Sequence, residues 1–543
     1  MEKIKLPKVV TFEFNIALFK HLGSKAHKFL LPSVVVLLVV VSIFAFKFYL
    51  SNGLGLAYND ARSHLNIGRR VVEGLKPGLA QIGSVWLPLP HLLMVPTIWN
   101  DFMWHSGLAG AIQSMFSFVL IGALIWMYLK ELHVSLLGRI FGVVVFVFNI
   151  NILYLQSTAM TELLLLATMT LSAYELLMWH KTETSLHLIK AAFWVMISTV
   201  TRYDGWFLLF ASSMFILLRY ARKKDYRTAE GTFILFCTLA GLGVGLWLLW
   251  NLLVFKDPLF FALGPFSAKA QQDQIDQAGL LITKHNWYQS FKFYFYAMTY
   301  NSGFLNVVLG FLGMLAVLKD KLLSKDVKSS VMLLLAPLFF NVLALYLGHS
   351  VLFIQGLSGD TWFNVRYGIM LMPTIAIFSG FLIDRAKRFR LPLIFLYLMF
   401  TFFNFYGGDA VTIDDALVGS SQKNVSEVSG WLKDHATDKK GFILMSAASH
   451  DAIIFSSGLP MKRFIHEGTG LYWLNALSYP DKWARWIVMR TNDTNDLAFR
   501  GVSKSEGFAK YNLVGQYPFA DIYELKDEYL FELNTDPVIG KQK

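Results

Sequence analysis

Asp60 is the residue whose type and position most directly suggest chemistry. It lies in the stretch Tyr58-Asn59-Asp60-Ala61-Arg62-Ser63-His64, about ten residues after the first long apolar run. An acid, an arginine and a histidine therefore follow a predicted membrane helix, where charged side chains are costly and often functional. A carboxylate there can act as a general base, with Tyr58 and His64 as candidate substrate-binding residues. The alternative is an N-cap of the helix predicted over 61–75, and Asp60 could serve as both.

A second carboxylate, Glu162, ends the sequence Ser157-Thr-Ala-Met-Thr-Glu162 and opens the fourth predicted span. We expect it slightly inside the membrane, level with Asp60. Two carboxylates at one depth can share a divalent cation such as Mg²⁺ or Mn²⁺, or one can be the base while the other positions it. The alternative, which carries equal weight, is an acid that is favourable at the N-terminal end of a helix dipole.

Arg366 lies in Asn364-Val-Arg-Tyr367 and opens the tenth predicted span. An arginine at this depth either extends to the membrane surface or clamps a phosphate. We favour the clamp, because arginines and lysines that flank the spans lie mostly on the opposite side. Arg62 and Arg202 are candidate second contacts to the same phosphate.

Weaker candidates complete the set of possible site residues. Arg202 and Asp204 fall in the turn Thr201–Trp206, where a local ion pair is slightly favoured over catalysis. His64 and His91 are single histidines, which are more often simply polar. The remaining candidate substrate-binding residues are Asp204 and Tyr367. No phosphate-binding loop, dinucleotide-binding glycine motif or zinc spacing is present in the sequence.

The elements that must position these residues are membrane helices. The chain has 543 residues, of which 55% are hydrophobic and only 16% charged, whereas soluble domains are about a quarter charged. Apolar runs near or above the ~20 residues that cross a hydrocarbon core recur along it. They predict eleven spans, over 29–50, 107–129, 137–156, 159–179, 186–200, 205–220, 231–255, 293–318, 330–350, 364–384 and 391–406.

The net charge of +12 does not indicate nucleic-acid binding, because its distribution follows the membrane. With the segment 1–28 as a cytoplasmic tail, the cytoplasmic loops hold 23 lysines and arginines and the opposite loops hold 10. This positive-inside bias predicts a cytoplasmic N-terminus in a multi-pass protein of the plasma membrane. An odd number of spans then places the C-terminal part outside.

The outer segment 51–106 holds more than a loop. Residues 61–75 have the spacing of an amphipathic helix that lies in the membrane interface. After Trp86-Leu-Pro-Leu-Pro-His91, the piece Leu92–Trp99 is too short to cross and predicts a re-entrant or surface helix. In the outer segment 256–292, the polar run Ala268–Gln277 predicts a mobile loop or an exposed helix.

At Gly407-Gly408-Asp409 the composition changes to mixed polar and apolar residues. We predict a small exterior α/β domain over 409–543. Its expected elements are a helix near 421–435, buried strands at Phe442–Met445 and Trp486–Met489, and a closing hairpin made of Leu513–Tyr517 and Ala520–Leu525 around Pro518.

These motifs together resemble the GT-C superfamily of membrane glycosyltransferases. The similarity is to the family 39 group of protein O-mannosyltransferases and lipid A aminoarabinose transferases. Asp60 after the first span, Leu87–Pro90 at the end of the outer loop and Glu162 at the fourth span match in that order. Arg366-Tyr367 is similar to the Arg-Tyr that opens a late span in that group. The resemblance covers residues 29–406, but Asp60 stands where the family has an Asp-Glu pair, and Thr201–Trp206 has no counterpart.

The resemblance implies an inverting transfer of a sugar from a polyprenyl-phosphate donor on the outer face of the membrane. Asp60 would deprotonate an acceptor hydroxyl of a glycan, lipid or protein. The motifs require no cofactor, although Asp60 and Glu162 can hold a divalent cation, and membrane lipids are the other expected partners. The rival class is a polytopic transporter or lipid flippase with an exterior binding domain. It should carry polar residues near the middle of several spans, whereas the acids here lie at one rim.

Overall fold

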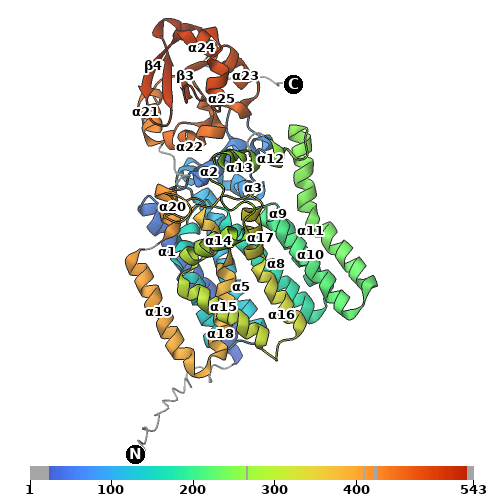
Figure 1. Ribbon diagram of the computed structural model, residues 1–543. Helices are drawn as coiled ribbons and strands as arrows, with labels where there is room; N and C mark the ends of the chain where they lie inside the picture. The colour runs from blue at the N-terminus through green and yellow to red at the C-terminus, as the bar shows by residue number, and fades with distance from the viewer. Residues whose placement is uncertain (1–23, 265–266, 409, 420–424, 535–543) are drawn as a thin grey trace, which may run out of the picture.

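The computed structural model describes residues 24–264, 267–408, 410–419 and 425–534. A helical bundle carries a smaller α/β domain at one end (Figure 1). The first helix, α1 (Ser24–Ser51), begins at the opposite end of the bundle. Most of the predicted tail 1–28 and the start of the predicted helix 421–435 lie outside the described residues.

Among the described residues, seven helical segments are long and apolar enough to cross a membrane, or eight if one bent pair forms a single span. The protein is therefore a polytopic helical membrane protein, as predicted, but the count of eleven spans was wrong. The seven segments are α1, α5 (Leu108–Glu131), α8 (Glu162–Thr182), α11 (Tyr226–Phe255), α16 to α17 (Lys325–Tyr346), η4 to α18 (Val365–Arg385) and the segment that contains α19 (Arg390–Gly407).

The other predicted spans are short, interrupted or charged. The run 137–156 divides into α6 (Leu136–Val147) and α7 (Ile150–Leu155), because the Asn149 side chain caps α7 by accepting a hydrogen bond from the Ile152 amide. The helix α9 (Ser185–Thr199) has 15 residues, which is about 22 Å and too short for a core of ~30 Å. The helix α10 (Asp204–Lys223) is long enough but begins with an acid and ends with basic residues.

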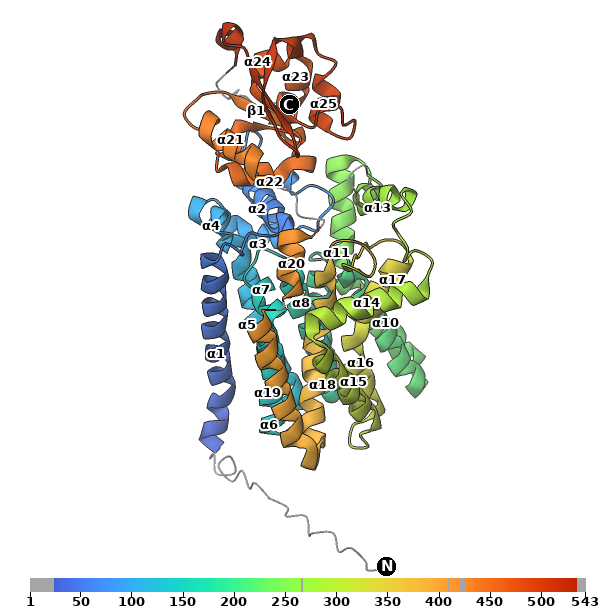
Figure 2. The ribbon, with the colours of Figure 1, turned by 60° about the vertical axis from the view of Figure 1, so that its left-hand side comes forward.

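The bent pair is α14 (Trp287–Ser302) and α15 (Phe304–Lys319), which meet at an angle of 108°. Gly303 joins them with a φ of 84°, a left-handed conformation that glycine adopts without strain. Hydropathy alone reports one continuous apolar run over 293–318, because no charged residue lies within it. Because of the bend, α14 runs across the bundle, whereas α15 runs along it (Figure 2).

Two spans form the centre of the bundle. In α8 and in the segment from η4 (Val365–Leu371) to α18 (Met372–Arg385), 83% of the apolar stretch is buried, against 22% for α1 and α11. The helix α8 packs on α5 and α9, and α18 packs on α6 and α15. Glu162 is the first residue of α8, and Arg366 is the second residue of η4. The two candidate residues therefore lie at the ends of the most buried spans.

The segment 51–106 forms the layer between the bundle and the α/β domain (Figure 2). Its main helix α2 (Asn59–Val72) corresponds to the predicted helix 61–75, with Asp60 in the first turn and Tyr58 at the N-cap position. The helix packs between α3 (Leu89–Ile98) and a helix of the α/β domain, α22 (Ala447–Ser457). It is thus more enclosed than an interfacial helix. The polar run Ala268–Gln277 is helix α13, which Ser267 caps.

The C-terminal domain is built on a five-stranded sheet of order β2-β1-β3-β5-β4. The predicted strands are confirmed as β1 (Phe442–Met445) and β3 (Ala484–Met489), which are parallel. The predicted hairpin is confirmed as antiparallel β4 (Tyr511–Gln516) and β5 (Asp521–Leu525). The two-residue edge strand β2 (Phe464–Ile465) was not predicted.

Helices cover the sheet, and a short helix precedes the domain. The covering helices are α21 (Ser426–Ala436), α22, α23 (Leu471–Ser478), α24 (Pro480–Trp483) and α25 (Leu497–Val502). The preceding helix, α20 (Val411–Val418), packs instead on α7 and η4 of the bundle. It therefore joins the last span to the domain and touches the segment that carries Arg366.

Candidate active site

Arg366 is positioned by the unusual backbone of η4. Asn364 precedes the segment in a left-handed conformation, with φ 54°, and its side chain donates to the Val351 carbonyl at 3.1 Å. Gly368 allows η4 to approach α14, because a Cβ at this position would lie 2.2 Å from the Ala297 carbonyl oxygen. These local features hold the Arg366 backbone close to the centre of the bundle.

The guanidinium of Arg366 connects three carboxylates from distant parts of the chain. Its Nη2 lies 2.7 Å from Asp60 Oδ2, and its Nε lies 3.1 Å from Glu162 Oε1. Its Nη1 lies 3.7 Å from Asp415 Oδ2 of α20 and has no hydrogen-bond partner among the described residues. Asp60 and Glu162 are therefore brought to one guanidinium, as their predicted depths suggested.

Arg202 adds a second cation to this cluster. Its Nη1 lies 3.2 Å from Glu162 Oε1 and 3.0 Å from Thr161 Oγ1, while its Nε lies 3.5 Å from Asp204 Oδ2. The local ion pair with Asp204 is thus present, and it is joined to the cluster through Glu162. We call Asp60, Glu162, Arg202, Asp204, Arg366 and Asp415 the charged cluster.

The acids of the charged cluster differ in exposure. The Asp60 side chain is 32% exposed, whereas Glu162, Asp204 and Asp415 are 1%, 6% and 0% exposed. Four carboxylates share two guanidinium groups, and Glu162 Oε2 and Asp415 Oδ1 have no hydrogen-bond partner among the described residues. Asp60 is the carboxylate of this cluster that a ligand can reach.

Two tyrosines pack on the arginines. The Arg366 guanidinium lies 5.1 Å from the centre of the Tyr58 ring and 5.2 Å from that of Tyr367, and Arg202 lies 5.1 Å from Tyr367. Such contacts fix the plane of a guanidinium and stabilise its charge. The Tyr58 hydroxyl donates to Asp415 Oδ2 at 3.1 Å.

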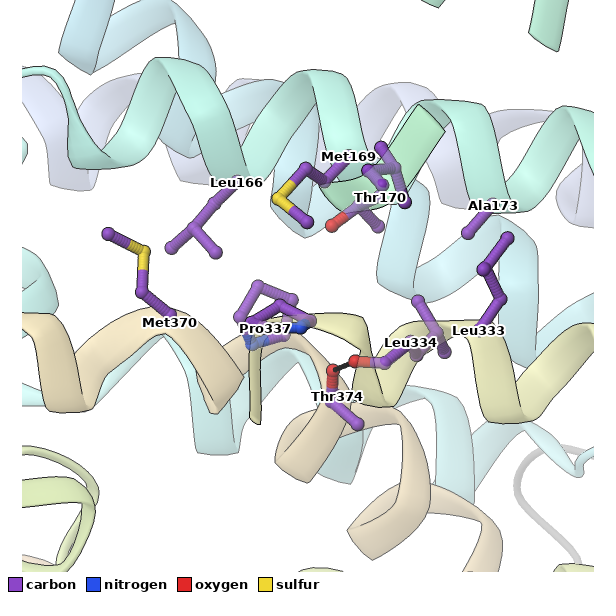
Figure 3. Close-up of a pocket in the computed structure, with 11 residues that line it drawn as sticks. Leu166, Met169, Thr170, Ala173, Leu333, Leu334, Pro337, Met370 and Thr374 are labelled. Atoms are coloured by element: carbon purple, nitrogen blue, oxygen red, sulfur yellow. Dashed lines mark hydrogen bonds between the residues drawn. The ribbon is translucent and has the colours of Figure 1, made fainter. Parts of the chain in front are cut away.

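Figure 3 shows a mostly apolar pocket that is lined in part by α8 and by the segment from η4 to α18. Leu166 and Met370, one turn along from Glu162 and Arg366, are among its lining residues. Figure 3 also shows Pro337 and the Thr374 hydroxyl, which donates to the Leu334 carbonyl at 2.7 Å.

His64 and His91 lie beside the cluster and not within it. Their ring nitrogens, His64 Nδ1 and His91 Nε2, are 2.9 Å apart. The Trp86 ring packs on the His64 ring, with 4.3 Å between the ring centres. Burial, together with Arg202 and Arg366, lowers the pKa of His64 to about 3, and burial lowers the pKa of His91 well below its ordinary value. Burial therefore favours the neutral form of both imidazoles.

Arg62 lies apart from the other candidates. Its Nε donates to the Leu56 carbonyl at 2.9 Å, and its Nη1 lies 3.4 Å from Asn59 Oδ1 and 3.5 Å from Ser456 of α22. The side chain thus faces the α/β domain.

The charged cluster does not fit a resident divalent cation. Within the described part of the chain, no three His, Cys, Asp or Glu side chains converge as metal ligands. The guanidinium of Arg366 already lies between Asp60 and Glu162. An ion shared by these two acids would have to replace the guanidinium.

The sequence reasoning missed Asp415. Its only sequence signal is an acidic pair, Asp414-Asp415, inside the otherwise apolar stretch Val411–Val418. Because the composition changes at Gly407–Asp409, this stretch was assigned to the C-terminal domain, where acidic residues are common and do not indicate a site. Its contact with Tyr58 spans 357 residues of sequence, which no local pattern reveals.

Solved structures of similar fold exist, although no sequence family model and no curated protein sequence matches the chain. ArnT from Cupriavidus metallidurans bound to undecaprenyl phosphate superposes with a TM-score of 0.57 at 10% identity, over 91% of this chain and 98% of that one. Its apo state gives 0.54 at 11% identity, over 92% and 99%. The Archaeoglobus fulgidus oligosaccharyltransferase complex with Zn and sulfate gives 0.51 at 9% identity, over 84% and 67%. The chain therefore shares the fold of these GT-C proteins, which confirms the predicted resemblance at the level of the fold.

Proposed function

We propose that this protein is a membrane glycosyltransferase that moves a sugar from a polyprenyl-phosphate donor to an acceptor hydroxyl. The observation that carries the proposal is Asp60, a reachable carboxylate paired at 2.7 Å with the buried Arg366. The GT-C fold supports it, since the similar ArnT structure is a complex with undecaprenyl phosphate. The acceptor is a glycan, a lipid or a protein on the outer face of the plasma membrane.

Asp60 is the general base in this proposal. It takes the proton of the acceptor hydroxyl, whose oxygen attacks the anomeric carbon and forms the new glycosidic bond. The bond from that carbon to the phosphate oxygen breaks on the opposite side, so the configuration inverts. Glu162 is a poorer candidate for the base, because its side chain is 1% exposed. Its contacts with Arg202 and Arg366 suit a positioning role.

Arg366 receives the phosphate of the donor. As the sugar leaves, the phosphate diester becomes a monoester with more negative charge, so a guanidinium that contacts it binds the transition state more tightly than the ground state. Arg366 must then exchange its contact with Asp60 for the phosphate, which also frees Asp60 to accept a proton. Its Nη1 has no hydrogen-bond partner among the described residues and is available for the same purpose.

The remaining candidates surround these two groups. Arg202 is the second phosphate contact, and Tyr367 packs on both arginines. Tyr58, His64, His91 and Asp204 shape the adjacent surface. Arg62 is a weaker phosphate contact than Arg202, because its side chain faces α22. The charges gather at the first residue of α8, and not midway along the spans, which favours an enzyme over a transporter.

The test is transfer by the purified protein in lipid nanodiscs. A panel of polyprenyl-phosphate hexoses and pentoses is supplied with extracted cell-envelope glycans, lipids and proteins. We expect release of polyprenyl phosphate and a matching mass increase in one acceptor class, both absent in Asp60→Asn. Equal transfer by a folded Asp60→Asn protein would reject the proposed base. Failure of the wild-type protein with every donor would reject the activity.

A further inference from the structure

Asp415 is a buried acid to which the reaction described above gives no role. Its side chain is 0% exposed, its Oδ2 accepts from the Tyr58 hydroxyl at 3.1 Å, and the same oxygen lies 3.7 Å from Arg366 Nη1. A buried carboxylate is costly unless it is paired. Its position beside a guanidinium that already has two acids therefore calls for an explanation.

The helix that carries Asp415 has a second connection to Arg366. The backbone amide and the hydroxyl of Thr412 donate to Asn151 Oδ1 at 3.0 and 2.7 Å. The Asn151 amide donates to the Asn301 carbonyl at 3.0 Å, and the Asn301 side chain donates to the Val365 carbonyl at 2.6 Å. All three side chains are buried. This chain of hydrogen bonds ends at the residue before Arg366.

The helix α20 is therefore connected to Arg366 in two ways. Asp415 contacts its guanidinium, and the hydrogen bonds from Thr412 lead to the carbonyl of the preceding residue, Val365. When a donor phosphate takes Arg366 from Asp60, the contacts with Glu162 and Asp415 are the ionic contacts that still hold the guanidinium. Asp415 cannot itself meet an acceptor, because it is fully buried.

We propose that Asp415 is a positioning residue for the transfer reaction, which holds Arg366 and Tyr58 in the orientation that the lipid phosphate requires. The proposal rests on the proposed function. It assigns α20 the task of linking the C-terminal domain to the phosphate-binding guanidinium.

The first test compares two neighbouring acids on α20. Asp415→Asn keeps the size of the side chain and removes its charge, whereas Asp414→Asn changes an exposed acid on the same helix. We expect the turnover of folded, monodisperse Asp415→Asn protein to fall by about 10²-fold, because small misplacements at a reacting centre have effects of that size. Asp414→Asn should stay within about threefold of wild type. Equal turnover in the two variants would overturn the proposal.

The second test is a double-mutant cycle with Arg366→Lys. If Asp415 acts through Arg366, the double variant should lose little more than Arg366→Lys alone. Losses that multiply would show that Asp415 acts separately and would overturn the proposal. Tyr58→Phe provides a second variant if Asp415→Asn does not fold, because it removes only the hydroxyl that contacts Asp415. It should give a smaller loss that is also non-additive with Arg366→Lys.

The same cycle can be measured without turnover. Thermal stabilisation by undecaprenyl phosphate reports binding of the phosphate alone. We expect Arg366→Lys and Asp415→Asn each to reduce it, and the double variant to reduce it no further. A wild-type protein that binds this lipid but transfers no sugar would reject the proposed function, and the binding cycle would then decide the role of Asp415 by itself.

Discussion

Glu162 and Asp496 are both acids at the start of a helix, one in the bundle and one in the C-terminal domain. Asp496 caps α25 and accepts four hydrogen bonds, from the Arg490, Ala498 and Phe499 amides and from His450 Nε2 at 2.7 Å. Glu162 has two arginines on one oxygen and no hydrogen-bond partner on the other among the described residues. Both carboxylate oxygens of Asp496 accept hydrogen bonds, as expected of an acid that stabilises the fold. The acids around Arg366 retain carboxylate oxygens that accept none among the described residues.

The comparison extends to the charge of these groups. Burial would raise the pKa of Asp496, but the hydrogen bonds from His450 and the backbone outweigh it and lower the pKa below its ordinary value. In the charged cluster, by contrast, four carboxylates share two guanidinium groups. We infer that the cluster is arranged for an incoming ligand, and the Asp496 pair for stability. The predictions below can break that distinction.

The largest effect is expected for Asp60→Asn. Loss of a general base costs typically ~10²–10⁴-fold in rate, and the side chain is partly exposed, so stability should change little. The measurement is the initial rate of polyprenyl phosphate release, with the melting temperature as the control for folding. A variant that melts several degrees lower and keeps its turnover would place Asp60 with Asp496 among the acids that serve the fold.

Arg366→Lys should have the next largest effect. Lysine keeps the charge but cannot contact two carboxylates and a phosphate through a planar group. We expect turnover to fall by roughly 10²-fold or more, the usual cost of removing one donor that stabilises transition-state charge. Turnover with a polyprenyl-phosphate sugar is compared with that of Arg485→Lys, an arginine on β3 that pairs with Glu524. Comparable turnover in the two variants would contradict the clamp.

Asp496→Asn should affect stability and not turnover. An amide in place of the carboxylate presents an N–H to the His450 and Arg490 donors, which leaves buried donors unpaired. We expect a loss of about 1–3 kcal/mol in the free energy of unfolding, seen as earlier unfolding of the C-terminal domain in denaturant. The turnover of the folded fraction should equal that of wild type. A loss of turnover similar to that of Asp60→Asn would remove the distinction between the two regions.

The last expected effect is on stability as a function of pH, through the contact between α2 and α22. Burial raises the pKa of Asp451 to about 6, although Asn66 donates to this side chain and Arg70 lies 3.5 Å away. The folded protein therefore binds this proton more tightly than the unfolded chain. The stability it contributes is present below the unfolded pKa of about 4 and is lost as pH rises toward 6, with a slope of at most ~1.4 kcal/mol per pH unit.

The measurement for Asp451 is the melting temperature between pH 4 and 7. Wild type should lose stability across this range relative to Asp451→Asn, which cannot titrate there. Parallel pH profiles for the two proteins would show that the α2–α22 contact does not depend on this proton.

Much of this arrangement could be predicted from local sequence. Acids at the ends of apolar runs predicted that Asp60 and Glu162 lie at one depth, and the structure places both within hydrogen-bonding distance of Arg366. Their catalytic roles remain predictions. Alternating apolar residues likewise predicted β1, β3 and the final hairpin, because strand patterns depend on immediate neighbours.

The features that were missed depend on geometry that hydropathy does not record. A cap by Asn149 and a bend at Gly303 change the number of spans without changing the apolar character of either run. Asp415 reaches Arg366 only because α20 folds back onto α7 and η4. Contacts of this kind join parts of the chain that share no periodic pattern.

The close approach of η4 to α14 has a consequence for mutational scanning of this protein. A side chain of any size at position 368 would have to displace the Ala297 carbonyl, which a Cβ would approach to 2.2 Å. In a saturation library, this position should tolerate no replacement and would score as strictly as Asp60. Replacements at Gly368 would nevertheless fail because the protein does not fold. The abundance of folded protein must therefore be measured alongside activity before intolerance at a position is taken as evidence for chemistry there.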